Sequence, residues 1–257
     1  MILRTDLRVF QAIVTYITLR CAFACYNFVV DRITLIPYEV ERVKSSMQLI
    51  IESDNLQDFL EATDVVNFHD PLIAKLIADI KSSSSGQEER AEKAFNFARD
   101  QVRHSFDADD LVVTIKAPEV LTAGTGICFA KSHLLAALLR GLEIPTGFCY
   151  QRVMRRGTPE SGFALHGLNA SYFPGVGWVR LDPRGNRPGI DSRFSLQEEH
   201  LAYSINSQAG EVDYPYVYRQ PLSPVIQSMQ DSKDCHELFY QRPPRIEEGS
   251  MLNPPLR

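Results

Sequence analysis

Apolar residues recur at helical spacing between residues 56 and 102. Residues 56–80 and 88–102 both carry an apolar stripe with a period near 3.6. Within the first of these segments, Asp70 followed by Pro71 is typical of a helix N-cap with proline at the first helical position. The pattern therefore predicts at least two amphipathic helices before residue 103.

The segment 124–141 predicts the most strongly apolar helix of the chain. Two glycines interrupt the backbone at its start, and Cys128 then opens a run of good helix formers. We expect Gly141 to end this helix in the left-handed conformation, with Leu142 as its apolar partner. The positions expected to be buried are Ala130, Leu134, Leu135, Leu138 and Leu139.

After Pro145 the apolar period changes from that of a helix to that of strands. Strands are expected at residues 147–154, 166–173 and 178–181. The letters PGVG at 174–177 are typical of a hairpin turn, so the last two strands should pair antiparallel.

Composition changes along the chain suggest three regions. Residues 1–46 are apolar and β-branched without a clean period, and we treat them as an N-terminal extension of uncertain status. Residues 47–194 read as one domain that carries the helices and strands. Residues 195–257 predict a helix near 224–239 and a Pro-rich tail that packs on the core, and no chemistry is assigned to them.

The overall charge and the cysteine count exclude some classes of function. A formal net charge of −5 and a pI near 5.7 do not favour nucleic-acid binding, which needs clustered Lys and Arg. Five scattered cysteines do not predict a disulfide framework and fit a reducing, cytoplasmic compartment. No P-loop, dinucleotide-binding or HExxH motif occurs, so we expect neither a cofactor nor a metal.

The apolar stretch at residues 9–30 leaves an alternative localisation open. Arg20 lies in its middle, and a charge there is costly in lipid, so no integral membrane span is expected. Arg4 and Arg8 precede the stretch as in a signal peptide. Membrane association or secretion therefore stays open if this segment acts as an anchor or signal.

Three residues have the types and the order needed for thiol chemistry. Cys128 lies at the predicted helix start, where unpaired N–H groups and the helix dipole favour a thiolate and could stabilise an oxyanion. His166 opens a predicted strand and could act as the general base and acid. Pairing through the turn at 174–177 brings Asp182 close to His166, where it could orient the imidazole.

The same residues resemble the core of the transglutaminase-like superfamily. The matching pieces are GICFA at 126–130, HGLNASYF at 166–173 and GWVRLDP at 177–183. HSFD at 104–107 resembles the end of the helix that usually precedes the cysteine, so the resemblance spans roughly residues 103–186.

This resemblance implies an α+β, papain-like fold in which the Cys-bearing helix packs on an antiparallel sheet. It implies that Cys128 is the nucleophile, His166 the base and Asp182 the orienting group, within a catalytic domain at residues 47–194. We see no acidic cluster resembling the calcium sites of animal transglutaminases, so calcium dependence is not implied.

Other residues whose side chains could take part in catalysis receive simpler interpretations. Cys149 lies inside a strand pattern and is interpreted as core, and His133 as a surface or packing residue. His104 is interpreted as a helix-end histidine, with substrate positioning as the alternative. Trp178 is interpreted as a core or cleft-wall aromatic residue.

The favoured function is a cysteine protease or amidase that forms a thioester on Cys128 and acts on a protein or peptide substrate. Crosslinking of glutamine side chains by a transglutaminase stays open, because it uses the same triad with an amine in place of water. A non-catalytic binding module on the same fold stays open as well. The sequence predicts neither the substrate nor the oligomeric state.

Overall fold

The computed structural model describes residues 47–252, and the statements below concern that part of the chain. The expected extension at 1–46, with its possible signal or anchor, lies outside the described residues. Between residues 47 and 252, no helix is both long and apolar enough to span a bilayer.

A four-stranded antiparallel sheet forms the centre of the fold. Its strands are β4 (Thr146–Met154), β5 (Phe163–Phe173), β6 (Gly177–Leu181) and β7 (Val212–Asp213), in the order β6-β5-β4-β7. The predicted hairpin is present, with Phe173 opposite Gly177. The strand β5 begins three residues earlier than predicted, so that His166 lies inside the strand.

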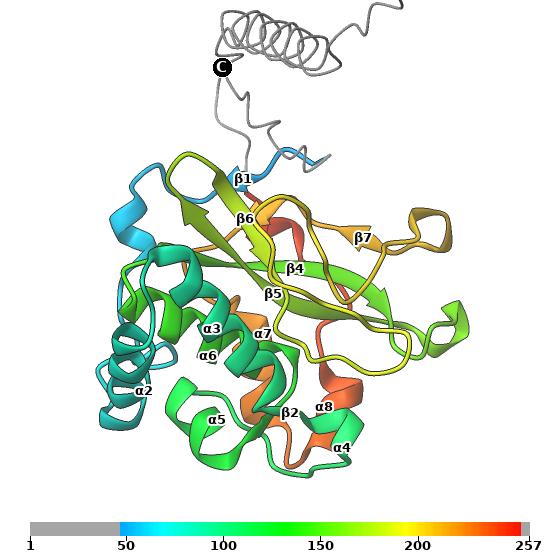
Figure 1. The fold of residues 1–257 in the computed structure, drawn as a ribbon. Helices are drawn as coiled ribbons and strands as arrows, with labels where there is room; N and C mark the ends of the chain where they lie inside the picture. Colours follow the sequence, from blue (N-terminus) through cyan, green and yellow to red (C-terminus); the bar gives the residue numbers. More distant parts are fainter. Residues whose placement is uncertain (1–46, 253–257) are drawn as a thin grey trace, which may run out of the picture. The chain divides into compact units, whose positions relative to one another are not determined.

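The helices gather on one face of this sheet (Figure 1). The helix α6 (Cys128–Gly141) packs directly on β4 and β5, and α2 (Pro71–Ser82), α3 (Gln87–Asp100) and α5 (Ala117–Ala123) pack around α6. All five positions of α6 that the sequence predicts as buried have no exposed surface. The fold is thus α+β, with the Cys-bearing helix packed on an antiparallel sheet, as predicted.

The start of α2 and the end of α6 test two local predictions. The Asp70 side chain accepts a hydrogen bond from the Leu72 N–H at 2.9 Å, and Pro71 is the first helical residue, as predicted. The prediction for Gly141 is wrong, because Glu143 takes the left-handed conformation instead, with φ 65°. Gly141 serves close packing, since a Cβ there would lie 2.2 Å from Ile77 Cδ1.

Several short elements were not predicted. The expected helix after residue 56 is a 3-10 turn, η1 (Leu56–Phe59), followed by an irregular stretch before α2. Two parallel pairs join distant segments: β1 (Ile50–Ile51) with β8 (Tyr216–Val217), and β2 (Arg103–His104) with β3 (Thr125–Gly126). The remaining short elements are α4 (Ser105–Ala108), η2 (Pro159–Ser161), η3 (Ser207–Ala209) and η4 (Glu248–Ser250).

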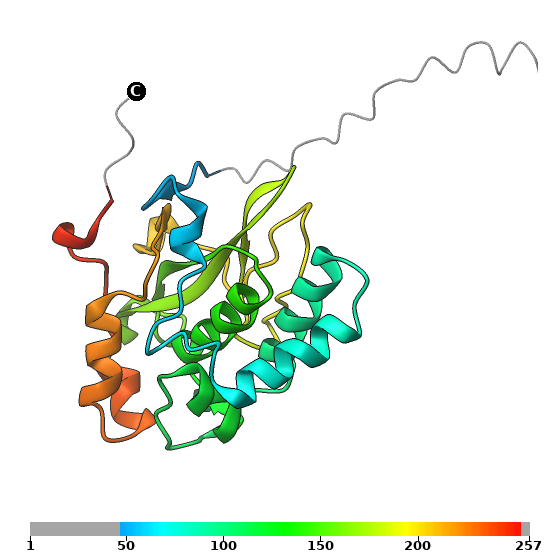
Figure 2. The same ribbon diagram turned by 90° about the vertical axis from the view of Figure 1, so that its left-hand side faces the viewer.

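The C-terminal segment ends in two helices where one was predicted. They are α7 (Ser223–Asp231) and α8 (Cys235–Gln241), which Figure 2 shows in orange beside the other helices. The Asp234 side chain caps α8 by accepting from the Glu237 N–H at 2.8 Å, so a new helix starts there. Apolar residues of both helices join the main core: Val225, Met229, Cys235 and Leu238. The described part of the tail therefore packs on the core.

Candidate active site

Cys128 is the first residue of α6 and is only 2% exposed. Ile127 precedes it as the N-cap, and its apolar side chain cannot accept a hydrogen bond from the first turn. The N–H groups of that turn are therefore left without a side-chain cap beside the Cys128 sulfur. This arrangement provides the positive helix end that the sequence predicts for the nucleophile.

His166 and Asp182 meet across the end of the β5–β6 hairpin. The imidazole Nε2 of His166 is 2.8 Å from the carboxylate Oδ2 of Asp182, and both side chains are buried. The Cys128 thiol lies on the other side of the imidazole, close enough to raise the pKa of His166. Since Nε2 is taken by Asp182, Nδ1 is the ring nitrogen left for the sulfur. The structure thus brings the three predicted residues together at one place.

The shortness of β6 creates the place that Cys128 occupies. Pairing between β5 and β6 ends at Asn169, so the edge of β5 before that residue is not covered by β6. There the Gly167 backbone lies beside the Cys128 sulfur and helps to lower the pKa of the thiol. A Cβ on Gly167 would lie 2.6 Å from Phe129 Cδ1, so only glycine lets the start of α6 approach this edge.

The electrostatics of this group favour an ion pair between sulfur and imidazole. Burial raises the pKa of the Cys128 thiol, but the charge and hydrogen bond of His166 outweigh it and hold that pKa below its ordinary value. Burial lowers the pKa of His166, but Asp182 and the thiolate outweigh this effect and raise it well above the ordinary value. Between these two pKa values, the site holds a thiolate and an imidazolium.

Three donors hold Asp182 as a carboxylate against the opposing effect of burial. Burial raises its pKa, but His166 and the N–H groups of Ala202 and Arg184 outweigh that effect and lower it. The Ala202 N–H donates to Oδ2 at 2.9 Å, and the Arg184 N–H donates to Oδ1 at 3.1 Å. The Tyr203 ring packs edge-on against the His166 imidazole, with 4.8 Å between ring centroids. These contacts keep Asp182 negatively charged and hold the plane of the His166 imidazole.

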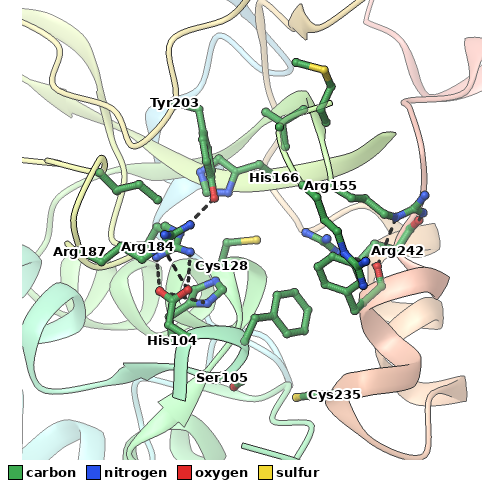
Figure 3. A pocket seen from close by; sticks show the side chains of 18 of the residues that line it. His104, Ser105, Cys128, Arg155, His166, Arg184, Arg187, Tyr203, Cys235 and Arg242 are labelled. Carbon is green, nitrogen blue, oxygen red and sulfur yellow. Dashed lines mark hydrogen bonds and ion pairs between the residues drawn. The ribbon is translucent and has the colours of Figure 1, made fainter. Parts of the chain in front are cut away.

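A cleft of about 890 Å³ opens onto Cys128 and His166. Figure 3 shows both side chains facing this space, with Tyr203 beside His166. One wall holds a bidentate ion pair, in which Arg184 Nη2 lies 2.9 Å from Asp107 Oδ1 and Arg184 Nη1 contacts Oδ2. Arg187 shares the same carboxylate, with Nε 3.3 Å from Oδ1. A cleft of this size can accept an extended peptide segment or a large side chain.

His104 also lines the cleft, and its position differs from the favoured interpretation. It lies in β2 and is the N-cap of α4, so it stands at the start of a helix and not at the C-terminal end of α3, and it is 8% exposed. Burial, together with nearby cations such as Arg184, holds its pKa well below the ordinary value, so its imidazole is neutral. Its Nδ1 is buried without a hydrogen-bond partner among the described residues. This placement agrees with the alternative of a residue that contacts substrate.

The other interpreted residues lie away from the nucleophile. Cys149 is fully buried on the far face of the sheet, where burial raises its pKa to about 12. His133 is buried, and its Nδ1 lies 2.7 Å from the Ile115 carbonyl oxygen, so it has a packing role. Trp178 packs edge-on against Phe59 at 4.8 Å and does not line the cleft.

The site residues that come from the C-terminal segment were not predicted. Ala202, Tyr203 and Arg242 all contribute to the site, although no chemistry was assigned to residues after 195. Their spacing carries no signal, because contacts between residues so far apart in the chain do not follow from periodicity. Arg184 could have been predicted as a site residue, because it directly follows the Asp182-Pro183 pair in the sequence. Over residues 47–252, no group of three His, Cys, Asp or Glu side chains is arranged to hold a metal ion.

Comparison with known proteins agrees with the resemblance read from the sequence. Residues 74–183 match the family model of the transglutaminase-like superfamily, which confirms the predicted core. No curated protein sequence gives a significant match. A solved structure named "putative cysteine protease", from Cytophaga hutchinsonii, is 17% identical with a TM-score of 0.42. That match covers 51% of this chain and 43% of the other protein, so the chain spans less than half of that protein's length.

Proposed function

Since residues 74–183 carry a transglutaminase-like core, we propose that the protein is a cysteine-dependent acyl-transfer enzyme that acts on peptide or carboxamide bonds. The observation that supports this proposal is the juxtaposition of Cys128 with His166, whose imidazole is hydrogen-bonded to Asp182, beside an open cleft. Three residue types in this order and geometry are what nucleophilic thiol catalysis requires.

In the first step, the Cys128 thiolate attacks the carbonyl carbon of the substrate. A carbon–sulfur bond forms, and the electron pair of the carbonyl π bond moves to the oxygen. The uncapped N–H groups at the start of α6 point toward this developing charge and can donate hydrogen bonds to it. His166 Nδ1–H then gives its proton to the leaving amine, the carbon–nitrogen bond breaks, and a thioester remains on Cys128.

In the second step, an acceptor attacks the thioester. His166 takes a proton from the acceptor, the carbon–sulfur bond breaks, and the thiolate returns. Asp182 keeps the imidazole in the orientation that both steps need, because it holds Nε2 and leaves Nδ1 free for the sulfur. Water as the acceptor gives hydrolysis, and a primary amine gives transamidation. We favour hydrolysis, because water is always available and we identify no feature in the described cleft that selects an amine.

A peptide mixture tests the proposal and separates the two outcomes. The protein is incubated with the mixture with and without a labelled primary amine, and products are read by mass spectrometry. We expect cleaved or deamidated peptides that vanish in Cys128→Ala, and an acyl adduct trapped on Cys128 at short times. Amine conjugates that depend on Cys128 would replace hydrolysis by transamidation. A peptide-processing activity that survives Cys128→Ala would contradict the proposal.

A further inference from the structure

Arg242 is a buried guanidinium in the wall of the same cleft. It follows directly after α8 and is 7% exposed. Its guanidinium carbon lies 4.9 Å from the centroid of the Phe106 ring and 5.0 Å from that of the Phe239 ring. These contacts hold the planar group against a pair of aromatic side chains that also contact each other, and they remove it from bulk water.

The charge of Arg242 has no carboxylate partner within residues 47–252. Arg184, the other buried guanidinium that lines the cleft, contrasts with it because it is paired with Asp107. A buried cation needs an anion or several hydrogen-bond acceptors. Arg140 bonds three backbone carbonyl oxygens, whereas the Arg242 guanidinium donates to one, that of Phe239, at 3.4 Å.

The anion that Arg242 reaches is the sulfur of Cys128. Arg242 and Cys128 line the same cleft, and the two side chains are close enough for the charge of one to act on the pKa of the other. Burial lowers the pKa of Arg242, and the thiolate opposes this effect. The nucleophile therefore lies between two cationic groups, the His166 imidazolium on one side and Arg242 on the other.

The backbone around Arg242 is anchored to the elements that frame His166. The carbonyl oxygen of Pro243 accepts a hydrogen bond from the Leu165 N–H at 2.7 Å, on the same free edge of β5 that meets Cys128. Arg155, just after β4, donates to the carbonyl oxygens of Tyr240 at 3.0 Å and Arg242 at 3.3 Å. These bonds fix Arg242 relative to the nucleophile from both sides.

From this geometry we infer that Arg242 is a catalytic residue, which pairs with the Cys128 thiolate and then donates a hydrogen bond to the oxyanion formed from the substrate carbonyl. This role rests on the proposed function. When the carbon–sulfur bond forms, the negative charge moves from the sulfur to the adjacent carbonyl oxygen, and no proton leaves Arg242. A guanidinium beside the sulfur can follow that charge, because sulfur and oxygen are then attached to the same carbon. Arg242 lies outside the matched segment 74–183, so the C-terminal segment adds it to the core.

The test compares alkylation of Cys128 by neutral iodoacetamide and by anionic iodoacetate. A cation beside the sulfur favours the anionic reagent, so the rate with iodoacetate divided by the rate with iodoacetamide reports the local charge. We expect Arg242→Gln to lower this rate ratio several-fold and to raise the pH midpoint of alkylation by about one unit. Turnover should fall about 10²-fold, as when an oxyanion donor is removed. Arg242→Lys keeps the charge without the planar fork, so it should retain the midpoint and still lose turnover.

The matched control is Arg245→Gln, which removes an exposed arginine three residues further along the same segment, where Nε lies 3.4 Å from Glu247 Oε1. It should leave the rate ratio, the midpoint and turnover unchanged. Circular dichroism and thermal melting check each variant, and Arg242→Lys carries the test if Arg242→Gln does not fold. A wild-type ratio, midpoint and turnover in both folded Arg242 variants would overturn the inference. If wild-type Cys128 itself shows no alkylation at low pH, the proposed function fails first, which is a different result.

Discussion

The segment 74–183 and the segment 195–252 contribute to the site in different ways. The first provides the groups proposed to react: Cys128, His166 and Asp182. The second provides groups that surround them, namely the Ala202 N–H on the Asp182 carboxylate, the Tyr203 ring against His166, and Arg242 beside the sulfur. One hairpin and one helix start position the first set. The second set is positioned where the segment 195–252 packs against the core.

This difference concerns how the proposed chemistry is divided. The matched core positions the three side chains proposed to react, through the register of the β5–β6 hairpin and the start of α6. The C-terminal segment covers these side chains, and we propose that it tunes their charge and orientation. Mutations in the first segment should therefore abolish the reaction, and mutations in the second should tune it.

The largest effect is expected from Cys128→Ala. Removal of the nucleophile should lower kcat about 10⁴-fold or more without unfolding, because the side chain shrinks by one atom. The measurement is turnover of a peptide substrate identified as described above. Cys149→Ala is the matched control, because that thiol is equally buried on the far face of the sheet. A loss of similar size in Cys149→Ala would mean that altered packing explains both variants.

Asp182→Asn should lower kcat by about 10³- to 10⁴-fold, because the amide no longer favours the required imidazole form. It should also move the basic limb of the pH profile. Asp182 raises the pKa of His166, so its loss lowers that pKa, and the imidazolium is then lost at a lower pH. The acidic limb, set by the thiol, should move up, since a weaker imidazolium stabilises the thiolate less. A pH–rate profile of unchanged shape would contradict the orienting role.

Leu238→Ala and Leu134→Ala compare the two segments by stability. Both side chains are completely buried, Leu238 in α8 and Leu134 in α6, so each variant should lose about 2–5 kcal/mol of unfolding free energy. Urea unfolding measures both. Because Arg242 directly follows α8, Leu238→Ala should also reduce the turnover of the protein that remains folded. Equal turnover in Leu238→Ala and wild type would show that the packing of α8 does not affect the site.

Tyr203 should give the smallest effect. Tyr203→Leu removes the edge-on ring contact with His166, worth about 0.5–1.5 kcal/mol, and should lower kcat about two- to tenfold. Tyr203→Phe keeps the ring and loses only the hydrogen bond from Arg184 Nε at 3.1 Å. It should therefore remain closer to wild type in a steady-state assay. If Tyr203→Phe loses as much as Tyr203→Leu, the hydroxyl accounts for the effect and the ring contact does not.

The parts of the fold that follow from local pattern were predictable. The helix α6 and the β5–β6 hairpin have clear periods and a clear turn, and their positions bring Cys128, His166 and Asp182 together. The end of α6 was predicted wrongly, because the need for close packing of Gly141 against Ile77 outweighs the usual C-cap preference. The roles of Tyr203 and Arg242 were not predictable, because they depend on where a long irregular segment crosses the core.

The alkylation rate of each cysteine as a function of pH tests the central claim most directly. Iodoacetamide labelling is read by mass spectrometry for the wild type and for His166→Ala. The account predicts that Cys128 reacts quickly well below the ordinary thiol pKa of about 8.5, and that loss of His166 abolishes this. Cys149, with a pKa raised to about 12, should stay unreactive and serves as the internal reference. Slow labelling of Cys128 that does not change in His166→Ala would contradict the account.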